Sequence, residues 1–362
     1  MLSLKGNSSV IINNKESLDW LRYCISKANE KPSITDWYKL LCFLRNHTIE
    51  SVCFPHSKDP LIPKELYIKW MGLVQLISDR NEIINRRIVE AVSFLEDAGF
   101  KCVLLKGQGN AVYYPVASCR VPGDIDLWID ENRENLYCFI RRHFPNASIN
   151  RKHIKLPLFT DTEIDVHYTP LKFYSHILNK RFNRWVKCDK VKLLSEKMIL
   201  DGNRFGIIVP TSFFNVIYLL GHIQIHLIEN GVGLRQIIDY YYLLKSLDVT
   251  NTSEKDDIVS VIRNLRLDKI ASAIMWIMKD YFGLSDAYLI MPTNKILGEL
   301  VFEDIIEGGN FGKMRRVKGF QRSMRLLRLM PVFPFCEFFA RVTNRIYNSI
   351  QFICKLTLKA VS

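Results

Sequence analysis

The chain has 362 residues, of which 48% are hydrophobic and 24% are charged. These values are ordinary for globular proteins and exclude wholesale disorder and a polytopic membrane protein. The formal net charge is +13, but residues 311–362 hold eleven Lys or Arg and a single acid, Glu337, so the rest of the chain is near neutral and shows no chain-wide surface for a nucleic-acid template.

Helical periodicity dominates the first hundred residues. Apolar side chains recur at helical spacing from Leu18 to Leu44, and the pattern continues over residues 64–98 without an internal proline. Gly99 closes it. We therefore predict an N-terminal helical region over residues 1–95.

The hydrophobic period changes to two after Gly99, which indicates strands. We predict a small sheet in a core that spans residues 96–210, its last two long strands joined as a hairpin. The expected strands are residues 102–105, 124–129, 154–159, 163–168 and 206–209.

The remainder of the chain is again helical. Thr211 is a candidate N-cap for a long helix that ends at Glu229. The glycines at 231 and 233 separate it from a second helix, and further helices follow over 255–305. We expect a helical accessory region over 211–310 and a basic amphipathic tail over 311–362, within an α+β fold.

Two carboxylates share one face of a predicted strand. Asp124 and Asp126 are two residues apart, and strand side chains alternate between faces. Neighbouring carboxylates stay ionised when a cation lies between them, and Mg²⁺ prefers oxygen ligands with phosphates in its shell. Asp165 lies in another alternating strand and is expected to complete the site or act as a base. A solvent-facing strand edge is the alternative for an isolated Asp-x-Asp.

A Lys-Gly turn precedes this pair. Lys106 and Gly107 end one predicted strand and open a short helix, where backbone N–H groups and the ammonium can approach phosphate. Val112 stands where a dinucleotide fingerprint has Gly or Ala, and the Walker A spacing is absent. Arg120 and Gly123 add a phosphate-directed cation and a flexible joint.

These motifs resemble the signature of an uncharacterised bacterial nucleotidyltransferase family of the DNA polymerase beta-like superfamily. The resemblance covers about residues 80–250 and includes the stretches 105–107, 120–127, 164–167, 222–226 and 234–239. It implies a small mixed sheet flanked by helices, Mg²⁺ (or Mn²⁺) on two or three carboxylates, and transfer of a nucleoside monophosphate from a triphosphate to an acceptor. Better-known members have Gly-Ser or Gly-Gly in place of Lys106-Gly107, which implies a different phosphate grip.

The helical region contributes candidate pocket residues. His222 and His226 share one helix face at a spacing that suits zinc, although no metalloprotease glutamate accompanies them, and packed histidines are the alternative. Arg235 and Asp239 are also four apart, so an intrahelical ion pair is open. We expect these four residues and His167 to border the nucleotide or acceptor pocket.

Cysteine usage and hydropathy bear on location. Nine cysteines occur without a Cys-x-x-Cys pair, several in apolar runs, which predicts reduced, buried thiols in a cytoplasm. The first fourteen residues do not resemble a secretory signal. The most apolar stretch, residues 213–228, contains four polar residues and is too short to span a bilayer comfortably. We therefore expect no transmembrane helix.

The tail leaves three partners open. Its basic residues alternate with apolar ones, as in segments that lie on the inner face of an anionic membrane, while nucleic acid and simple packing on the domain are alternatives. The leading hypothesis for the whole chain is a metal-dependent nucleotidyltransferase with an unidentified hydroxyl-bearing acceptor. The alternative is an inactive nucleotide-binding module that docks at a membrane-associated assembly.

Overall fold

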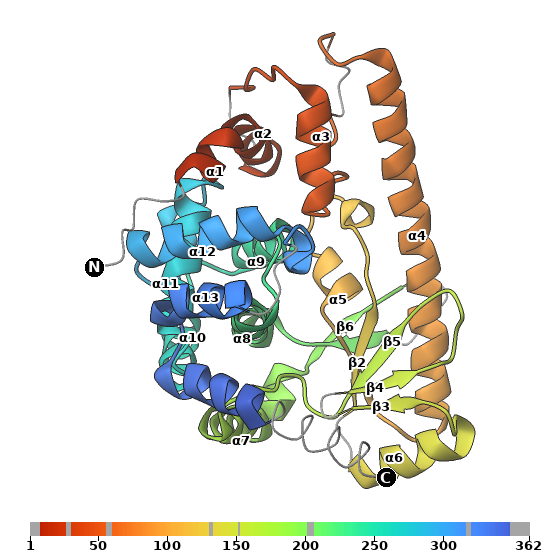
Figure 1. The fold of residues 1–362 in the computed structure, drawn as a ribbon. Coiled ribbons are helices and arrows are strands. Elements are labelled where there is room, and N and C mark those ends of the chain that lie inside the picture. Colours follow the sequence, from red (N-terminus) through yellow and green to blue (C-terminus); the bar gives the residue numbers. More distant parts are fainter. Residues whose placement is uncertain are drawn as a thin grey trace, which may run out of the picture.

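The α+β fold is confirmed by a computed structural model, which describes residues 8–26, 30–55, 60–129, 133–150, 153–200, 206–315 and 320–347. Its centre is a small mixed sheet of five strands, with helices on both faces (Figure 1). A separate pair of short strands lies beside it.

The N-terminal part is helical, as predicted. Asp36 caps one helix by accepting a hydrogen bond from the Lys39 N–H, and Gly99, at φ +88°, follows the end of the longest one. The helices are α1 (Ser8–Asn13), α2 (Lys15–Ser26), α3 (Trp37–Asn46) and α4 (Lys64–Asp97).

The sheet has the strand order β1-β2-β5-β4-β3, and only the central pair β2 and β5 is parallel. Its strands are β1 (Cys102–Leu105), β2 (Ile125–Ile129), β3 (Ser148–Ile149), β4 (His153–Leu156) and β5 (Ile164–His167). The antiparallel pair β4 and β5 is the predicted hairpin. The expected strand at 206–209 is β7 (Ile207–Val209), which pairs with β6 (Glu196–Met198) outside this sheet.

The two faces of the sheet belong to different apolar cores because side chains alternate along each strand. Leu104 and Leu127 pack towards α4 and α6 (Arg133–His143), which cover one face. Val103 and Trp128 join the other core, where Trp128 stacks on Phe214 at 6.4 Å between ring centroids. Figure 1 shows α4 along one side of the sheet and the helical layer on the other.

The helical layer begins where the sequence predicts it, since Thr211 accepts a hydrogen bond from the Phe214 N–H at the start of α8. α2 and α3 pack into this same core through Trp20 and Leu40. The predicted N-terminal region, residues 1–95, therefore contributes to both apolar cores, since α4 packs in the other one. The remaining helices are α5 (Gly107–Ala111), α7 (His176–Leu193), α8 (Ser212–Glu229), α9 (Leu234–Ser246), α10 (Thr252–Asn264), α11 (Asp268–Asp280), α12 (Lys295–Gly308) and α13 (Phe320–Arg328), with 3₁₀ turns η1 (Ala117–Cys119), η2 (Asp286–Tyr288), η3 (Asn310–Gly312) and η4 (Met330–Val332). Residues 335–347 are also helical.

The start of the basic tail is anchored on the body of the protein. Arg315 and Arg325 reach Asp304, which is fully buried, at 2.9 and 2.7 Å. Arg322 donates to the backbone carbonyl of Glu229 at 3.1 Å, at the C-terminal end of α8, where unpaired carbonyls favour a cation. These arginines therefore hold the segment in place, while residues 316–319 and 348–362 of the predicted tail lie outside the described residues.

No helix within the described ranges combines the length and the apolar character needed to cross a bilayer. The described cysteines are free thiols, but the expectation that they are buried holds only in part. Cys53 and Cys102 are buried, whereas Cys42, Cys138 and Cys188 are exposed. The exposed cysteines lie on helices, where residues adjacent in sequence point in different directions, so a cysteine beside a core residue can face solvent.

Candidate functional site

The structure brings the three predicted carboxylates together. The parallel register sets Asp126 of β2 opposite Asp165 of β5, and Asp124 lies immediately before β2. One carboxylate oxygen from each of the three lies within 4.8 Å of the others. The alternation of strand side chains and the register of two neighbouring strands thus place all three on one face.

The donor chemistry of this cluster fits a divalent cation. Asp126 and Asp165 are 5% and 8% exposed, and Oδ1 of Asp165 is buried with no hydrogen-bond partner among the described residues. Burial and the charges of Asp126 and Asp124 raise the pKa of Asp165 to about 6. The Asp126 charge also raises the pKa of Asp124, whose side chain is exposed to solvent. Asp124 and Asp165 thus resist ionisation beside the charged Asp126, and a bound Mg²⁺ or Mn²⁺ would relieve this repulsion among three oxygen donors.

Asp126 is the best-compensated member of the cluster. Lys106 Nζ lies 2.9 Å from its Oδ2, and His167 Nε2 lies 2.7 Å from its Oδ1. Burial alone would raise the pKa of Asp126, but the Lys106 charge and the His167 hydrogen bond outweigh burial and hold that pKa well below its usual range. The Lys-Gly turn, with Lys106 at φ +49° and Gly107 at φ +44°, directs the ammonium to this carboxylate.

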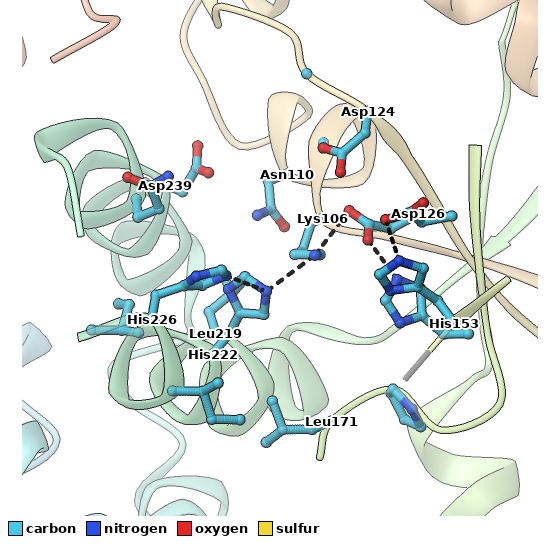
Figure 2. A pocket seen from close by; sticks show the side chains of 18 of the residues that line it. Lys106, Asn110, Asp124, Asp126, His153, Leu171, Leu219, His222, His226 and Asp239 are labelled. Carbon is cyan, nitrogen blue, oxygen red and sulfur yellow. Dashed lines mark hydrogen bonds and ion pairs between the residues drawn. The ribbon is translucent and has the colours of Figure 1, made fainter. Parts of the chain in front are cut away.

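The two helical histidines continue from Lys106. His222 Nε2 lies 3.1 Å from Lys106 Nζ and 3.1 Å from His226 Nε2 (Figure 2). An ammonium can only donate, so the Lys106 contact makes His222 Nε2 an acceptor. No third metal ligand joins this histidine pair within the described part of the chain. The geometry therefore favours the polar pocket wall over the zinc alternative.

The alternative of an ion pair between Arg235 and Asp239 does not hold in the structure. Asp239 instead receives Arg120 through two contacts of 2.8 Å, together with the Tyr114 hydroxyl at 2.6 Å. A buried bidentate guanidinium pair is stronger than an i,i+4 pair on a helix surface. Arg235 donates to the Val121 carbonyl at 3.0 Å and has no carboxylate partner among the residues described. Of the two arginines, only Arg120 is paired with a carboxylate among the described residues.

The prediction missed other residues of the site, including Asn110 and His153. Asn110 is 1% exposed, lines the cavity, and has no hydrogen-bond partner for either amide atom within the described ranges. His153 Nε2 lies 3.3 Å from Asp165 Oδ2, and burial lowers the pKa of His153 to about 4, which keeps its ring neutral. The alternation His153-Ile154-Lys155 could have indicated the histidine, whereas nothing local distinguishes Asn110.

These groups line one cavity of about 330 Å³, within the usual range for small-ligand sites. Figure 2 shows Asp124 and Asp126 on one side and His222, His226 and Asp239 on the other, with Lys106 and Asn110 between them. All of the predicted site residues lie in its wall: Lys106, Gly107, Arg120, Gly123, Asp124, Asp126, Asp165, His167, His222, His226, Arg235 and Asp239.

A family model described as an uncharacterised nucleotidyltransferase matches residues 33–283. No curated protein matches the chain. Among solved structures, the chain is similar to an antigenic nucleotidyltransferase-like protein from Paracoccidioides brasiliensis, with 13% identity over 61% of this chain and 95% of that chain and a TM-score of 0.32.

Proposed function

Since the chain belongs to the uncharacterised nucleotidyltransferase family, we propose that it is a metal-dependent enzyme that transfers a nucleoside monophosphate from a nucleoside triphosphate to a hydroxyl-bearing acceptor. The observation that carries the proposal is the meeting of Asp124, Asp126 and Asp165 in one cavity that also holds several cationic side chains. In-line transfer to phosphorus needs mainly positioning and charge neutralisation, which such a cavity supplies.

Asp124, Asp126 and Asp165 would hold Mg²⁺ or Mn²⁺. When bound, this cation would supply positive charge to neutralise the triphosphate and the departing pyrophosphate. The unpartnered Oδ1 of Asp165 supports this assignment, because buried carboxylate oxygens are otherwise hydrogen-bonded. The position of Lys106 on Asp126 keeps part of the negative charge balanced in the free protein.

The side chains of the cavity have separate parts in the reaction. The acceptor oxygen bonds to the α-phosphorus while the bridging bond to the β-phosphate breaks, and pyrophosphate leaves with that electron pair. Asp165 holds the cation through Oδ1 and takes the acceptor proton on its other carboxylate oxygen. Arg235 and Asn110 bind phosphate oxygens. Arg235 has no carboxylate partner among the described residues, and neither amide atom of Asn110 has a hydrogen-bond partner there. Arg120 acts as a positioning residue by holding Asp239 of α9 against the loop before β2.

Label transfer tests the proposal. The purified protein is incubated with α-labelled nucleoside triphosphates, Mg²⁺ and a lysate of acceptors, and both labelled product and pyrophosphate are measured. Asp126→Asn is expected to lower the rate at least about a hundredfold. The matched control is Asp161→Asn, an exposed carboxylate that pairs with Arg87 outside the cavity. Release of orthophosphate in place of pyrophosphate, or full activity in Asp126→Asn, would contradict the proposal.

We also propose that the C-terminal segment rests on an anionic membrane surface, as the alternative function requires. Arg325 of α13 points inward to Asp304, whereas Phe320, Met324 and Leu327 are exposed at a spacing that forms one outward stripe. An apolar face on a segment that carries +10 suits the boundary between headgroups and acyl chains.

Vesicle co-sedimentation tests this membrane contact. Vesicles with phosphatidylserine should sediment the protein and phosphatidylcholine vesicles should not, and Phe320→Ser with Leu327→Ser should abolish the difference. Equal behaviour of the two vesicle types, or RNA binding with the same dependence on these residues, would contradict membrane docking. Tight triphosphate binding without turnover, together with vesicle binding, would favour the inactive module over the enzyme.

A further inference from the structure

One residue of the cavity wall comes from outside the family-matched range. Phe311, in η3, lines the cavity, whereas the family match ends at residue 283. We propose that Phe311 is the platform on which the base of the nucleoside triphosphate stacks. This inference rests on the proposed function and names how the same cavity recognises the nucleoside part of its substrate.

The backbone holds Phe311 in an unusual conformation. Its φ of 52° and ψ of 33° lie in the left-handed region, which costs a non-glycine residue about 1–2 kcal/mol. Gly309 and Gly312 on either side also have positive φ, and a Cβ on Gly312 would overlap the carbonyl oxygen of Asn230. A bulky residue kept in this region between two such glycines is typical of a site where function opposes local preference.

Both ends of this turn are fixed to the body of the protein. Asn310 is 4% exposed and accepts a hydrogen bond from Gln236 of α9 at 3.2 Å. Just after the turn, Arg315 is tied to the buried Asp304. The ring of Phe311 is therefore held at the cavity by contacts on both sides of the turn, as a preorganised binding surface requires.

The surroundings of the ring match a nucleotide laid along the cavity. Its centroid lies 5.0 Å from that of His226, and the Arg235 guanidinium lies 6.0 Å from the ring. His226 contacts His222, which contacts Lys106 beside the carboxylates. Along the cavity, the carboxylates and Lys106 are therefore followed by the two histidines and then by the Phe311 ring. A planar base is the part of a triphosphate that an aromatic face binds, and stacking is tolerant of base identity.

Calorimetry with two ligands separates base recognition from phosphate binding. Wild type and variants are titrated, with Mg²⁺, against α,β-methylene ATP and against inorganic tripolyphosphate. Phe311→Ala and Phe311→Leu are expected to weaken ATP-analogue binding by about tenfold or more, and Phe311→Tyr to retain it. Tripolyphosphate affinity should be unchanged in all three. The matched control is Phe335→Ala, since Phe335 belongs to the same C-terminal segment but is 75% exposed and outside the cavity wall.

Four outcomes overturn the inference. Wild-type affinity in Phe311→Leu would mean that bulk alone suffices. Equal loss for both ligands in Phe311→Ala would mean that the residue acts by packing its segment, and unchanged affinity for both ligands would mean that the ring does not contact the base. If the wild-type protein binds neither ligand with Mg²⁺, the proposed function fails as well, which distinguishes that failure from a defect confined to Phe311.

Discussion

Replacing Asp165 by asparagine is expected to stabilise the metal-free protein while it removes cation binding. Burial and two neighbouring carboxylates raise the pKa of Asp165 from 3.8 to about 6. Because the folded state then holds this proton more tightly than the unfolded chain, the contribution of Asp165 to folding stability is fully present below pH 3.8 and is lost as the pH rises through 6. The difference between the folded and unfolded pKa of Asp165 corresponds to about 3 kcal/mol of folding stability lost at neutral pH. An uncharged asparagine avoids this loss of stability.

Urea unfolding followed by tryptophan fluorescence measures the effect. In EDTA at pH 8, Asp165→Asn should raise the unfolding free energy by about 2–3 kcal/mol, and at pH 5 the gain should shrink because the wild-type carboxyl is then mostly protonated. Millimolar Mg²⁺ should stabilise only the wild type, through ligand linkage. Asp161→Asn, at an exposed carboxyl outside the cavity, is the control. An Asp165→Asn protein that is less stable than wild type at pH 8 without metal would refute the reasoning.

Three further substitutions test other parts of the structure. Asp239→Asn leaves the buried Arg120 guanidinium without its carboxylate and should lower the unfolding free energy by about 3–5 kcal/mol in urea; a loss below about 1 kcal/mol would show that the pair is not needed. Asp304→Asn should make the C-terminal segment the first site of limited proteolysis, because Arg325 loses its partner, and unchanged cleavage order would argue against this anchoring. Burial lowers the pKa of His47 to about 3, so the folded state excludes a proton that the unfolded chain binds below pH 6.5. Stability should therefore fall as the pH decreases from 6.5 towards 3, and His47→Leu should flatten that slope in urea unfolding at pH 4, 5 and 7, whereas an unchanged slope would assign acid sensitivity to other groups.

Features that depend on a few neighbouring residues could be predicted from the sequence. The alternation around Asp126 established that its neighbours Ile125 and Leu127 face a core, which the structure confirms. Thr211 was identified as an N-cap because its side chain bonds to a residue only three positions later. The α+β class and the hairpin of β4 and β5 follow from the same short-range periodicity.

The composition of the cavity was decided by contacts between distant segments. The parallel register of β2 and β5 sets Asp126 opposite Asp165, whereas alternation within each strand specifies only a face. Asp239 pairs with Arg120 and not with Arg235, because a buried carboxylate takes the guanidinium that reaches it bidentately, whatever its distance along the chain.

Asn110 and Phe311 carried no signal in the sequence, since a buried amide or an aromatic ring acquires a role only from the segments around it. Local propensity and periodicity act over a few residues and therefore determined which elements form and which side chains share a face. Burial and charge pairing act across the folded chain and selected which of those faces meet. For this protein, the sequence by itself predicts the three carboxylates and the cationic side chains near them, whereas the pairing of these groups and the aromatic part of the cavity wall were decided by tertiary structure.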